Sequence, residues 1–259
     1  MHFTTFLTLI YLAQAQSCHT SPERREATQC EPFHITFGPS TSADFYSNFA
    51  PISSKGSYAL TDSGLEMYLD KPDGNVTTES GVNDEVGRGS TINSTFILSF
   101  GKVTFEVLSP TIPGVIVAGI LIGDTSDDEI DIEFVCSEPT EWQTNLFVSD
   151  PRDSGPEYGV FSEKEKVDSI VKMHPYSIEV TPEKIFWSLD GKAVRTLAKD
   201  KCMRNGFSHY PTHTMRLQLG IWDASGSPGT AKWAKGPIDW SRTPDRITAT
   251  FRSVRVECP

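Results

Sequence analysis

Short segments in which apolar and polar residues alternate recur along most of the chain. A period of two is typical of a β-strand that buries one face. The pattern predicts strands over residues 64–69, 101–107, 176–180, 185–189, 215–222 and 247–256. The pair Asp190-Gly191 follows the fourth of these segments and predicts a tight hairpin into a strand over 192–195.

Three other segments do not alternate in this way. Residues 115–122 (VIVAGILI) are almost wholly apolar, which predicts a strand covered on both faces. Helical spacing is weak and confined to residues 162–172, and residues 16–40 have the polar composition of a loop. Because turn signals are frequent and strands do not alternate with helices, we predict an all-β fold. The expected form is an antiparallel β-sandwich of the jelly-roll, concanavalin-like type.

The ends of the chain suggest a simple domain organisation. Residues 1–15 have an apolar centre and end in Ala-Gln-Ala, which predicts a secretory signal peptide; a first core strand is the alternative. Turn residues are spread along the rest of the 259-residue chain, so we expect one domain over 16–259. No later segment approaches the length of apolar sequence that crosses a bilayer. With the signal peptide, this predicts a secreted, extracellular protein.

Charge and surface signals narrow the class of partner. The net charge of −11 argues against nucleic acid and against anionic membranes, since both attract basic proteins. It is compatible with a neutral or cationic polymer, and we expect a monomer. The sequons that begin at Asn75 and Asn93 are glycosylation sites if the protein is exported.

The cysteines become candidates for disulfides in a secreted protein. The chain has five, so at least one is free or bonded elsewhere. Cys18 and Cys30 bracket a short polar segment and are the predicted pair. Cys202 with Cys258 is a weaker second expectation, and Cys136 is left open.

The segment Asp-Glu-Ile-Asp-Ile-Glu at residues 128–133 is the most informative part of the sequence. On a strand, Glu129, Asp131 and Glu133 share one face, and the two isoleucines point into the core. Neighbouring carboxylates repel each other and do not help folding. They do suit a retaining glycosidase, which needs one carboxylate charged and one protonated, about 5–5.5 Å apart.

Two other interpretations compete with catalysis. Alternating acids are common on the solvated face of an edge strand. A calcium loop is the second alternative, since three aspartates lie just upstream, but Glu129 and Val135 stand where an EF-hand requires Gly and Glu. His209 and His213 lie in a Pro-containing loop without paired ligand spacing. We expect no metal and no cofactor.

The surroundings of the acidic strand resemble glycoside hydrolase family 16, whose signature is Glu-x-Asp-x-Glu on a jelly-roll strand. GKVTFEV and GVIVAGILIGDTSDDEIDIEF are followed by QTNLF, HPYSIEVTPEKIFWSLDGKAVRT and MRLQLGIWDASGSPGTAKWAKGPIDW. In this order they look most like the fungal cell-wall chitin–glucan crosslinking transglycosylases (Crh type), over roughly residues 40–245. The early Cys18 and Cys30 also resemble the N-terminal pair of that group.

The resemblance implies roles for individual residues. Glu129 matches the nucleophile, Glu133 the acid/base and Asp131 the supporting acid between them. Trp222 and Trp233 match a substrate-lining segment, where aromatic planes stack on sugar rings. Gln143 and Asn145 offer amides to sugar hydroxyls. Core packing is the alternative for any single tryptophan, and it leaves Trp142, Trp187 and Trp240 unassigned.

Some positions depart from the pattern of Crh-type proteins. Ile132 stands where those proteins usually carry Trp, Leu146 replaces an aromatic residue, and Val148-Ser149 replaces Lys-Gly. These changes bear on substrate range and on the balance between transfer and hydrolysis.

The function expected from the sequence is that of a secreted retaining glycosidase or transglycosylase. Its polysaccharide substrate is fungal cell-wall β-glucan, chitin or both, and it acts by double displacement. A plain endo-β-glucanase and a lectin-like glycan-binding module are the alternatives. A binding module has no need of both Glu129 and Glu133, which favours an enzyme.

Overall fold

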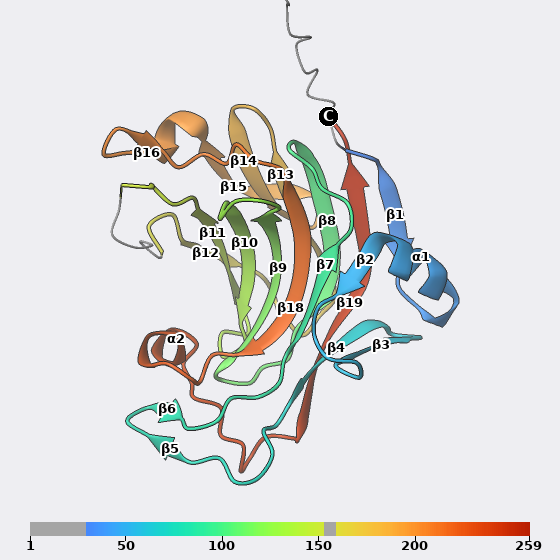
Figure 1. Ribbon diagram of the computed structural model, residues 1–259, viewed down its shortest axis with the longest axis vertical. Coiled ribbons are helices and arrows are strands. Elements are labelled where there is room, and N and C mark those ends of the chain that lie inside the picture. The colour runs from blue at the N-terminus through green and yellow to red at the C-terminus, as the bar shows by residue number, and fades with distance from the viewer. Residues whose placement is uncertain (1–29, 153–158) are drawn as a thin grey trace, which may run out of the picture.

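Two antiparallel β-sheets pack face to face, which confirms the predicted fold class (Figure 1). The computed structural model describes residues 30–152 and 159–259. The first sheet has eight strands in the order β15 (Lys192–Ala198), β14 (Lys184–Leu189), β13 (His174–Val180), β8 (Gly101–Leu108), β19 (Arg246–Glu257), β4 (Gly64–Asp70) and β3 (Tyr58–Thr61), with β1 (Phe33–Thr36) paired to β19.

The second sheet has seven strands and contains the acidic segment. Its order is β12 (Glu163–Lys166), β11 (Glu141–Phe147), β10 (Glu129–Val135), β9 (Val115–Gly123), β18 (Met215–Asp223), β7 (Ser90–Ser94) and β2 (Phe49–Pro51). Small hairpins are formed by β5 (Thr78–Glu79) with β6 (Val82–Asn83) and by β16 (Met203–Arg204) with β17 (Phe207–Ser208). The helical elements are α1 (Ser42–Asn48), α2 (Pro228–Trp233) and the 3-10 turns Pro39–Thr41 and Lys199–Cys202.

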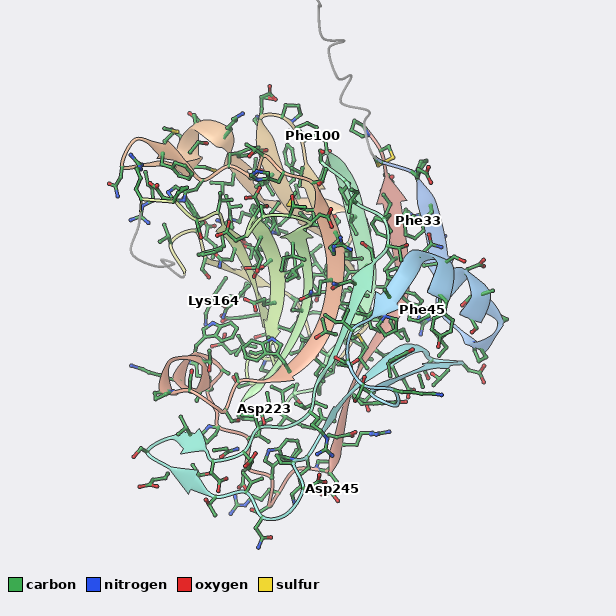
Figure 2. All side chains as sticks on the ribbon, in the orientation of Figure 1. Phe33, Phe45, Phe100, Lys164, Asp223 and Asp245 are labelled. Carbon is green, nitrogen blue, oxygen red and sulfur yellow. A yellow bond between two sulfur atoms is a disulfide. The ribbon has the colours of Figure 1, made fainter. Side chains whose placement is uncertain are left out.

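The core lies between the sheets and consists of the buried half of each alternating strand. In β8 every second residue is buried, which places Val103, Phe105 and Val107 in the core. Side chains fill the space between the sheets, and Phe45 lies on the side of the molecule opposite Lys164 (Figure 2). Full burial of each such side chain stabilises the fold by about 1.5–3 kcal/mol.

Strand β9 supports the acidic strand from the centre of its sheet. It lies between β10 and β18, and its residues from Val115 to Leu121 are all buried, as the apolar run predicts. Gly119 pairs with Ile132 of β10. A Cβ atom at Gly119 would lie 2.3 Å from the Phe105 ring. Glycine is therefore required there, because the ring from the opposite sheet packs directly against the β9 backbone.

Some expected local structures differ from those observed. The weak helical spacing over 162–172 does not correspond to a helix, because Glu163–Lys166 forms the edge strand β12, which pairs with β11. Its alternating Glu and Lys residues suit a sheet edge, where charges discourage further pairing. Within the expected loop over 16–40, Phe33–Thr36 forms β1. The predicted hairpin is present, with positive φ at Asp190 (52°) and Gly191 (74°).

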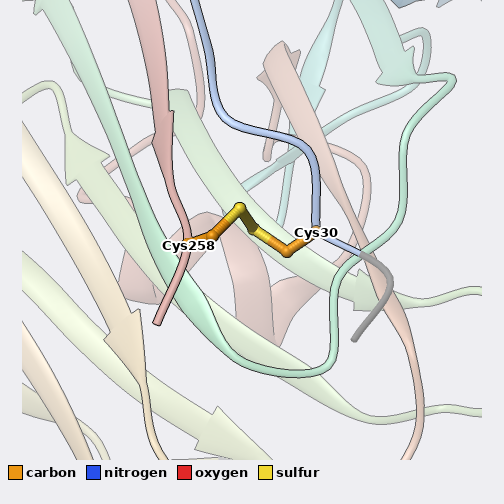
Figure 3. The surroundings of a disulfide bond; sticks show 2 residues. All are labelled: Cys30 and Cys258. Atoms are coloured by element: carbon orange, nitrogen blue, oxygen red, sulfur yellow. A yellow bond between two sulfur atoms is a disulfide. The ribbon is translucent and has the colours of Figure 1, made fainter. Parts of the chain in front are cut away.

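The disulfide predictions are wrong. Cys30 is bonded to Cys258, with 5.7 Å between their Cα atoms (Figure 3). Cys18 lies outside the described residues, and Cys202 is buried with a free thiol. The reason is a long-range pairing: β1 runs antiparallel to β19 with Phe33 opposite Val256, which brings the residues just outside these strands together. Proximity in sequence carries no information about that pairing.

The predicted signal peptide also lies outside the described residues. Of the helices that the structure does describe, none has both the length and the apolar character needed to span a bilayer.

Candidate active site

Strand β10 presents its acidic residues on the face of the second sheet that points away from the core. Ile130 and Ile132 have no exposed surface, whereas Glu129 and Glu133 are half-buried on the opposite face. Asp131, between the two glutamates, is only 3% exposed. The predicted division of this segment into a core face and a carboxylate face is therefore observed.

The register of the sheet places amides beside the carboxylates. Directly opposed residues of antiparallel strands project to the same face. On β11, Gln143 is opposite Glu133, and Asn145 is opposite Asp131. On β9, Ala118 is opposite Glu133, so a small side chain lies on that flank of the glutamate. Both predicted amides thus lie next to the predicted carboxylates.

Glu133 has the electrostatic character of a general acid. Burial, followed by the negative charge of Glu129, raises the pKa of Glu133 from its ordinary value of 4.5 to about 7. Both causes disfavour the charged carboxylate. Near neutral pH a substantial fraction of Glu133 therefore keeps its proton and can donate it.

The pKa of Asp131 is shifted in the same direction as that of Glu133. Burial raises the pKa of Asp131 well above its ordinary value, and the charges of Glu133 and Glu129 and a hydrogen bond with Glu129 act in the same direction. A hydrogen bond from Asn145 partly opposes the rise. Oδ1 of Asp131 and Oδ1 of Asn145 are both buried without a hydrogen-bond partner.

Trp222 and Trp233 form an aromatic pair at one end of this face. Their ring centroids are 6.0 Å apart with an interplanar angle of 25°. Trp222 lies on β18, and Trp233 ends the short helix α2, which lies beside the end of β18 (Figure 1). The Trp233 indole N–H donates to Oε1 of Gln143 over 3.0 Å. Because Gln143 is opposite Glu133, this hydrogen bond connects the predicted aromatic residues to the strand position of Glu133.

The same face contains a polar pair that the sequence analysis missed. Nε2 of Gln218 on β18 donates to Oδ1 of Asn93 on β7 over 2.7 Å. Register places Gln218 opposite Ile120 of β9, which is itself opposite Asp131. The available signal was the alternation of residues 215–222, in which Arg216, Gln218, Gly220 and Trp222 share one face. In the sequence, Asn93 stands out only as the first residue of a sequon.

The three unassigned tryptophans are buried. Trp142 and Trp187 have no exposed surface and Trp240 is 5% exposed. Of the departures from the Crh pattern, Ile132 and Leu146 also face the core, with 0% and 2% exposure. Those two changes therefore alter packing beneath the strand rather than the face that carries the carboxylates.

The aspartates just upstream of Glu129 bear on the calcium-loop alternative. Across 30–152 and 159–259, no three His, Cys, Asp or Glu side chains are grouped so as to hold a metal ion. Asp128, next to Glu129, is buried and accepts hydrogen bonds from the backbone N–H groups of Thr212 and His213. Nδ1 of His213 also lies 3.1 Å from Asp128. This aspartate anchors a loop.

Comparison with known families agrees with this geometry. The family model described as glycosyl hydrolases family 16 matches residues 45–242, which is more than half of the chain. The chain belongs to glycosyl hydrolases family 16. The matched region includes β10, β11, β18 and α2, and hence the seven residues predicted to be catalytic or substrate-binding.

Curated relatives of this family 16 chain are Crh-like proteins. The Crh-like protein 2 of Aspergillus fumigatus is 35% identical over 179 residues, which cover 66% of this chain and 40% of that protein. The Crh-like protein CRH11 of Candida albicans is 28% identical over 269 residues, covering 99% of this chain and 53% of that protein. The chain thus spans about half the length of the curated relatives it matches.

Solved structures extend the comparison to the fold. A Crh5 transglycosylase in complex with NAG matches with a TM-score of 0.71 and 26% identity, over 89% of this chain and 85% of that chain. A prokaryotic beta-1,3-1,4-glucanase (lichenase) from a mouse hindgut metagenome has a TM-score of 0.66 at 19% identity, over 88% of this chain and 99% of that chain. The second likeness shows the fold alone.

Proposed function

We propose that the protein is a retaining glycosidase or transglycosylase that acts on β-linked cell-wall polysaccharide, with Glu129 as nucleophile and Glu133 as general acid/base. The observation that carries the proposal is the shared face of Glu129 and Glu133 together with the raised pKa of Glu133. One carboxylate can then be charged while its neighbour is protonated, which double displacement requires.

In the first step, a carboxylate oxygen of Glu129 attacks the anomeric carbon. Glu133 gives its proton to the glycosidic oxygen as the bond to the leaving sugar breaks. Asp131 hydrogen-bonds Glu129, and its raised pKa disfavours a further negative charge beside the nucleophile. A covalent glycosyl-enzyme remains, and Glu133 is left as a carboxylate.

In the second step, Glu133 takes a proton from the acceptor, whose oxygen attacks the anomeric carbon and releases Glu129. Water as acceptor gives hydrolysis, and a hydroxyl group of a second glycan gives transfer. The Trp222–Trp233 pair supplies flat apolar surface on which a sugar ring can stack. We infer that this pair, with Gln143 and Asn145, binds glycan.

The likeness to Crh-like proteins and to a transglycosylase solved with NAG favours transfer between chitin and β-glucan chains. It also favours an extracellular or cell-wall location, which agrees with the signal peptide predicted from the sequence. We propose that the protein is secreted and acts there as a monomer.

The test uses a chitin oligomer as donor and a fluorescent β-glucan oligomer as acceptor, with products identified by mass. Hybrid chains are expected from the unaltered protein. Glu129→Gln should abolish every product, because the neutral amide cannot attack, while binding of the oligomers persists. Asp127→Asn is the matched control, since Asp127 is an exposed acid two residues upstream.

Each result has a distinct meaning. Shorter fragments without hybrids would assign the protein as a hydrolase rather than a transferase. Binding without any product from the unaltered protein would identify the glycan-binding module instead. Undiminished product formation by Glu129→Gln would remove Glu129 from its role.

A further inference from the structure

On the core side of β10, a side chain of the first sheet contacts the backbone of the strand that carries the carboxylates. Trp187 of β14 is fully buried, and its indole N–H donates to the carbonyl oxygen of Asp131 over 3.0 Å. The contact is made to the middle residue of the Glu-Ile-Asp-Ile-Glu segment. A side chain from the first sheet thereby fixes the backbone between Glu129 and Glu133.

A second buried side chain fixes the neighbouring strand β11. Arg195 of β15 is 6% exposed, and its Nη1 donates to the carbonyl oxygen and hydroxyl of Thr144 over 3.1 and 2.7 Å. Its Nη2 donates to the carbonyl oxygen of Phe161 over 2.5 Å. Thr144 lies between Gln143 and Asn145, so this contact too is made directly below site residues.

The two buried side chains also contact each other. The guanidinium carbon of Arg195 lies 4.4 Å from the centre of the Trp187 ring, within cation–π range. Trp187 pairs with Arg195 across β14 and β15. They form one unit, here called the Trp187–Arg195 tether, which contacts both strands of the site from the first sheet.

The chemistry of the tether is unusual for a core. Burial lowers the pKa of Arg195, because it disfavours the charged guanidinium. The carboxylate at its Nε, that of Glu163, is 3.5 Å away and its side chain is 61% exposed. A buried cation with so weak a counterion does little for stability, and apolar side chains of similar size often serve a core as well or better. The tether is therefore better explained by where its hydrogen bonds are made, to Asp131 and Thr144, than by a gain in stability.

We propose that Trp187 and Arg195 are positioning residues that hold β10 and β11 at the spacing and register the reaction needs. Their hydrogen bonds are made to the backbone of Asp131, to the backbone and hydroxyl of Thr144 and to the backbone of Phe161, and not to the carboxylates and amides of the site. Displacement of a reacting group by about 1 Å can lower a rate a hundredfold. The inference rests on the proposed function for its kinetic test, but not for its second test.

The kinetic test compares two substitutions of equal size at buried tryptophans. Trp187→Phe removes the hydrogen bond to Asp131. Trp142→Phe is the matched control, because Trp142 is equally buried and its indole N–H has no partner. We expect Trp187→Phe to lower kcat about tenfold or more with KM little changed, and Trp142→Phe to keep kcat within about twofold. Equal losses in the two variants would overturn the proposal.

The second test does not require turnover. Carbon-13 NMR of labelled glutamate follows the titration of Glu133, whose pKa in the intact protein is about 7. If the tether holds β10 in place, Trp187→Phe lets water in and relaxes the carboxylate spacing, so this pKa should fall toward 4.5. Trp142→Phe should leave it unchanged. An unaltered Glu133 titration in Trp187→Phe would overturn the proposal even if the protein turned over no glycan.

Arg195→Lys provides a variant that keeps the charge and loses the forked geometry. A lysine cannot bond Thr144 and Phe161 together as the guanidinium does. We expect the same direction of change in kcat and in the Glu133 titration. Arg255→Lys, at an exposed position of β19, is its control and should change neither. Wild-type values in Arg195→Lys would remove Arg195 from the tether.

Discussion

At the scale of single residues, the proposed chemistry depends on where Glu133 holds its proton. The cause lies in its position: a half-buried side chain four residues from Glu129 on the same face of one strand. Sequence alternation predicts that shared face, because the period of a strand is fixed. It does not predict how deeply Glu133 is buried, since Gln143 and the backbone around it come from other strands.

The raised pKa of Glu133 predicts how the reaction rate changes with pH. Because Glu133 must be protonated to act as an acid, kcat/KM is expected to fall as pH rises through about 7. The measurement is a pH–rate profile on a soluble oligosaccharide between pH 5 and pH 9. A rate that stays level across this range would contradict the assignment of Glu133.

The same shift makes stability depend on pH. Folding raises the pKa of Glu133 from 4.5 to about 7, so the folded state holds this proton more tightly than the unfolded chain. The contribution of Glu133 to the free energy of unfolding is therefore greatest below pH 4.5 and is lost as pH rises through 7. As pH rises from 4 to 8, we expect the free energy of unfolding of Glu133→Gln to increase relative to that of the parent protein. Urea unfolding at a series of pH values measures this difference. Asp127→Asn should show no such gain.

The two sequons differ in their surroundings, and we predict that Asn75 is glycosylated and Asn93 is not. Asn75 is exposed in the loop after β4, whereas the amide of Asn93 is bonded to Gln218 on the face that carries the carboxylates. In protein secreted from a glycosylating host, Asn75→Gln should lower the mass by one glycan. Asn93→Gln should leave the glycan content unchanged. A glycan found at Asn93 in active protein would contradict this expectation.

At the scale of elements, alternation predicted most of the long strands, the apolar run predicted β9, and β11 and the short strands were not predicted. The strands that include Val103, Ile178 and Leu217 were found because each buries every second residue over several positions. Helix α2 has only six residues and no readable period. Its place is set by tertiary contacts, since Trp222 and Trp233 pack against a small cluster that includes Val135. Only the resemblance to a family pointed to those tryptophans as site residues.

Helix α2 positions Trp233, which makes its hydrogen bond to Gln143 testable. Trp233→Phe keeps an aromatic plane but loses that bond, whose net contribution is about 1 kcal/mol. Loss of that amount corresponds to about a fivefold fall in the ratio of transfer to hydrolysis. Product ratios by mass spectrometry check it. Trp240→Phe is the control, because Trp240 is buried and its indole N–H has no partner.

At the scale of the whole molecule, long-range pairing decides features that the sequence alone leaves open. Two local expectations failed for this reason: the partner of Cys30 and the conformation around Glu163. The first depends on β1 meeting β19, and the second on β12 meeting β11. The Trp187–Arg195 tether is equally non-local, since Trp187 lies 56 residues from the Asp131 carbonyl that it bonds.

The disulfide closes a sequence separation of 228 residues and should matter for stability alone. Cys258→Ser is expected to lower the free energy of unfolding by about 2–5 kcal/mol, because the unfolded chain gains conformational freedom. Activity should persist, since the bond joins β1 and β19 of the first sheet and the carboxylates lie on the second. Reducing agent should weaken the parent protein to the level of the variant and leave the variant unchanged. A lower kcat in folded Cys258→Ser would contradict the expectation that the disulfide affects stability and not activity.

The uneven placement of the five tryptophans gives the molecule a built-in optical reporter. Trp142, Trp187 and Trp240 are shielded from solvent, so iodide in solution will scarcely dim their emission. The quenchable fluorescence will come mainly from the half-buried Trp222 and Trp233. A saccharide that settles on that pair will protect it from iodide, so occupancy of this face can be followed without labelling either the glycan or the protein.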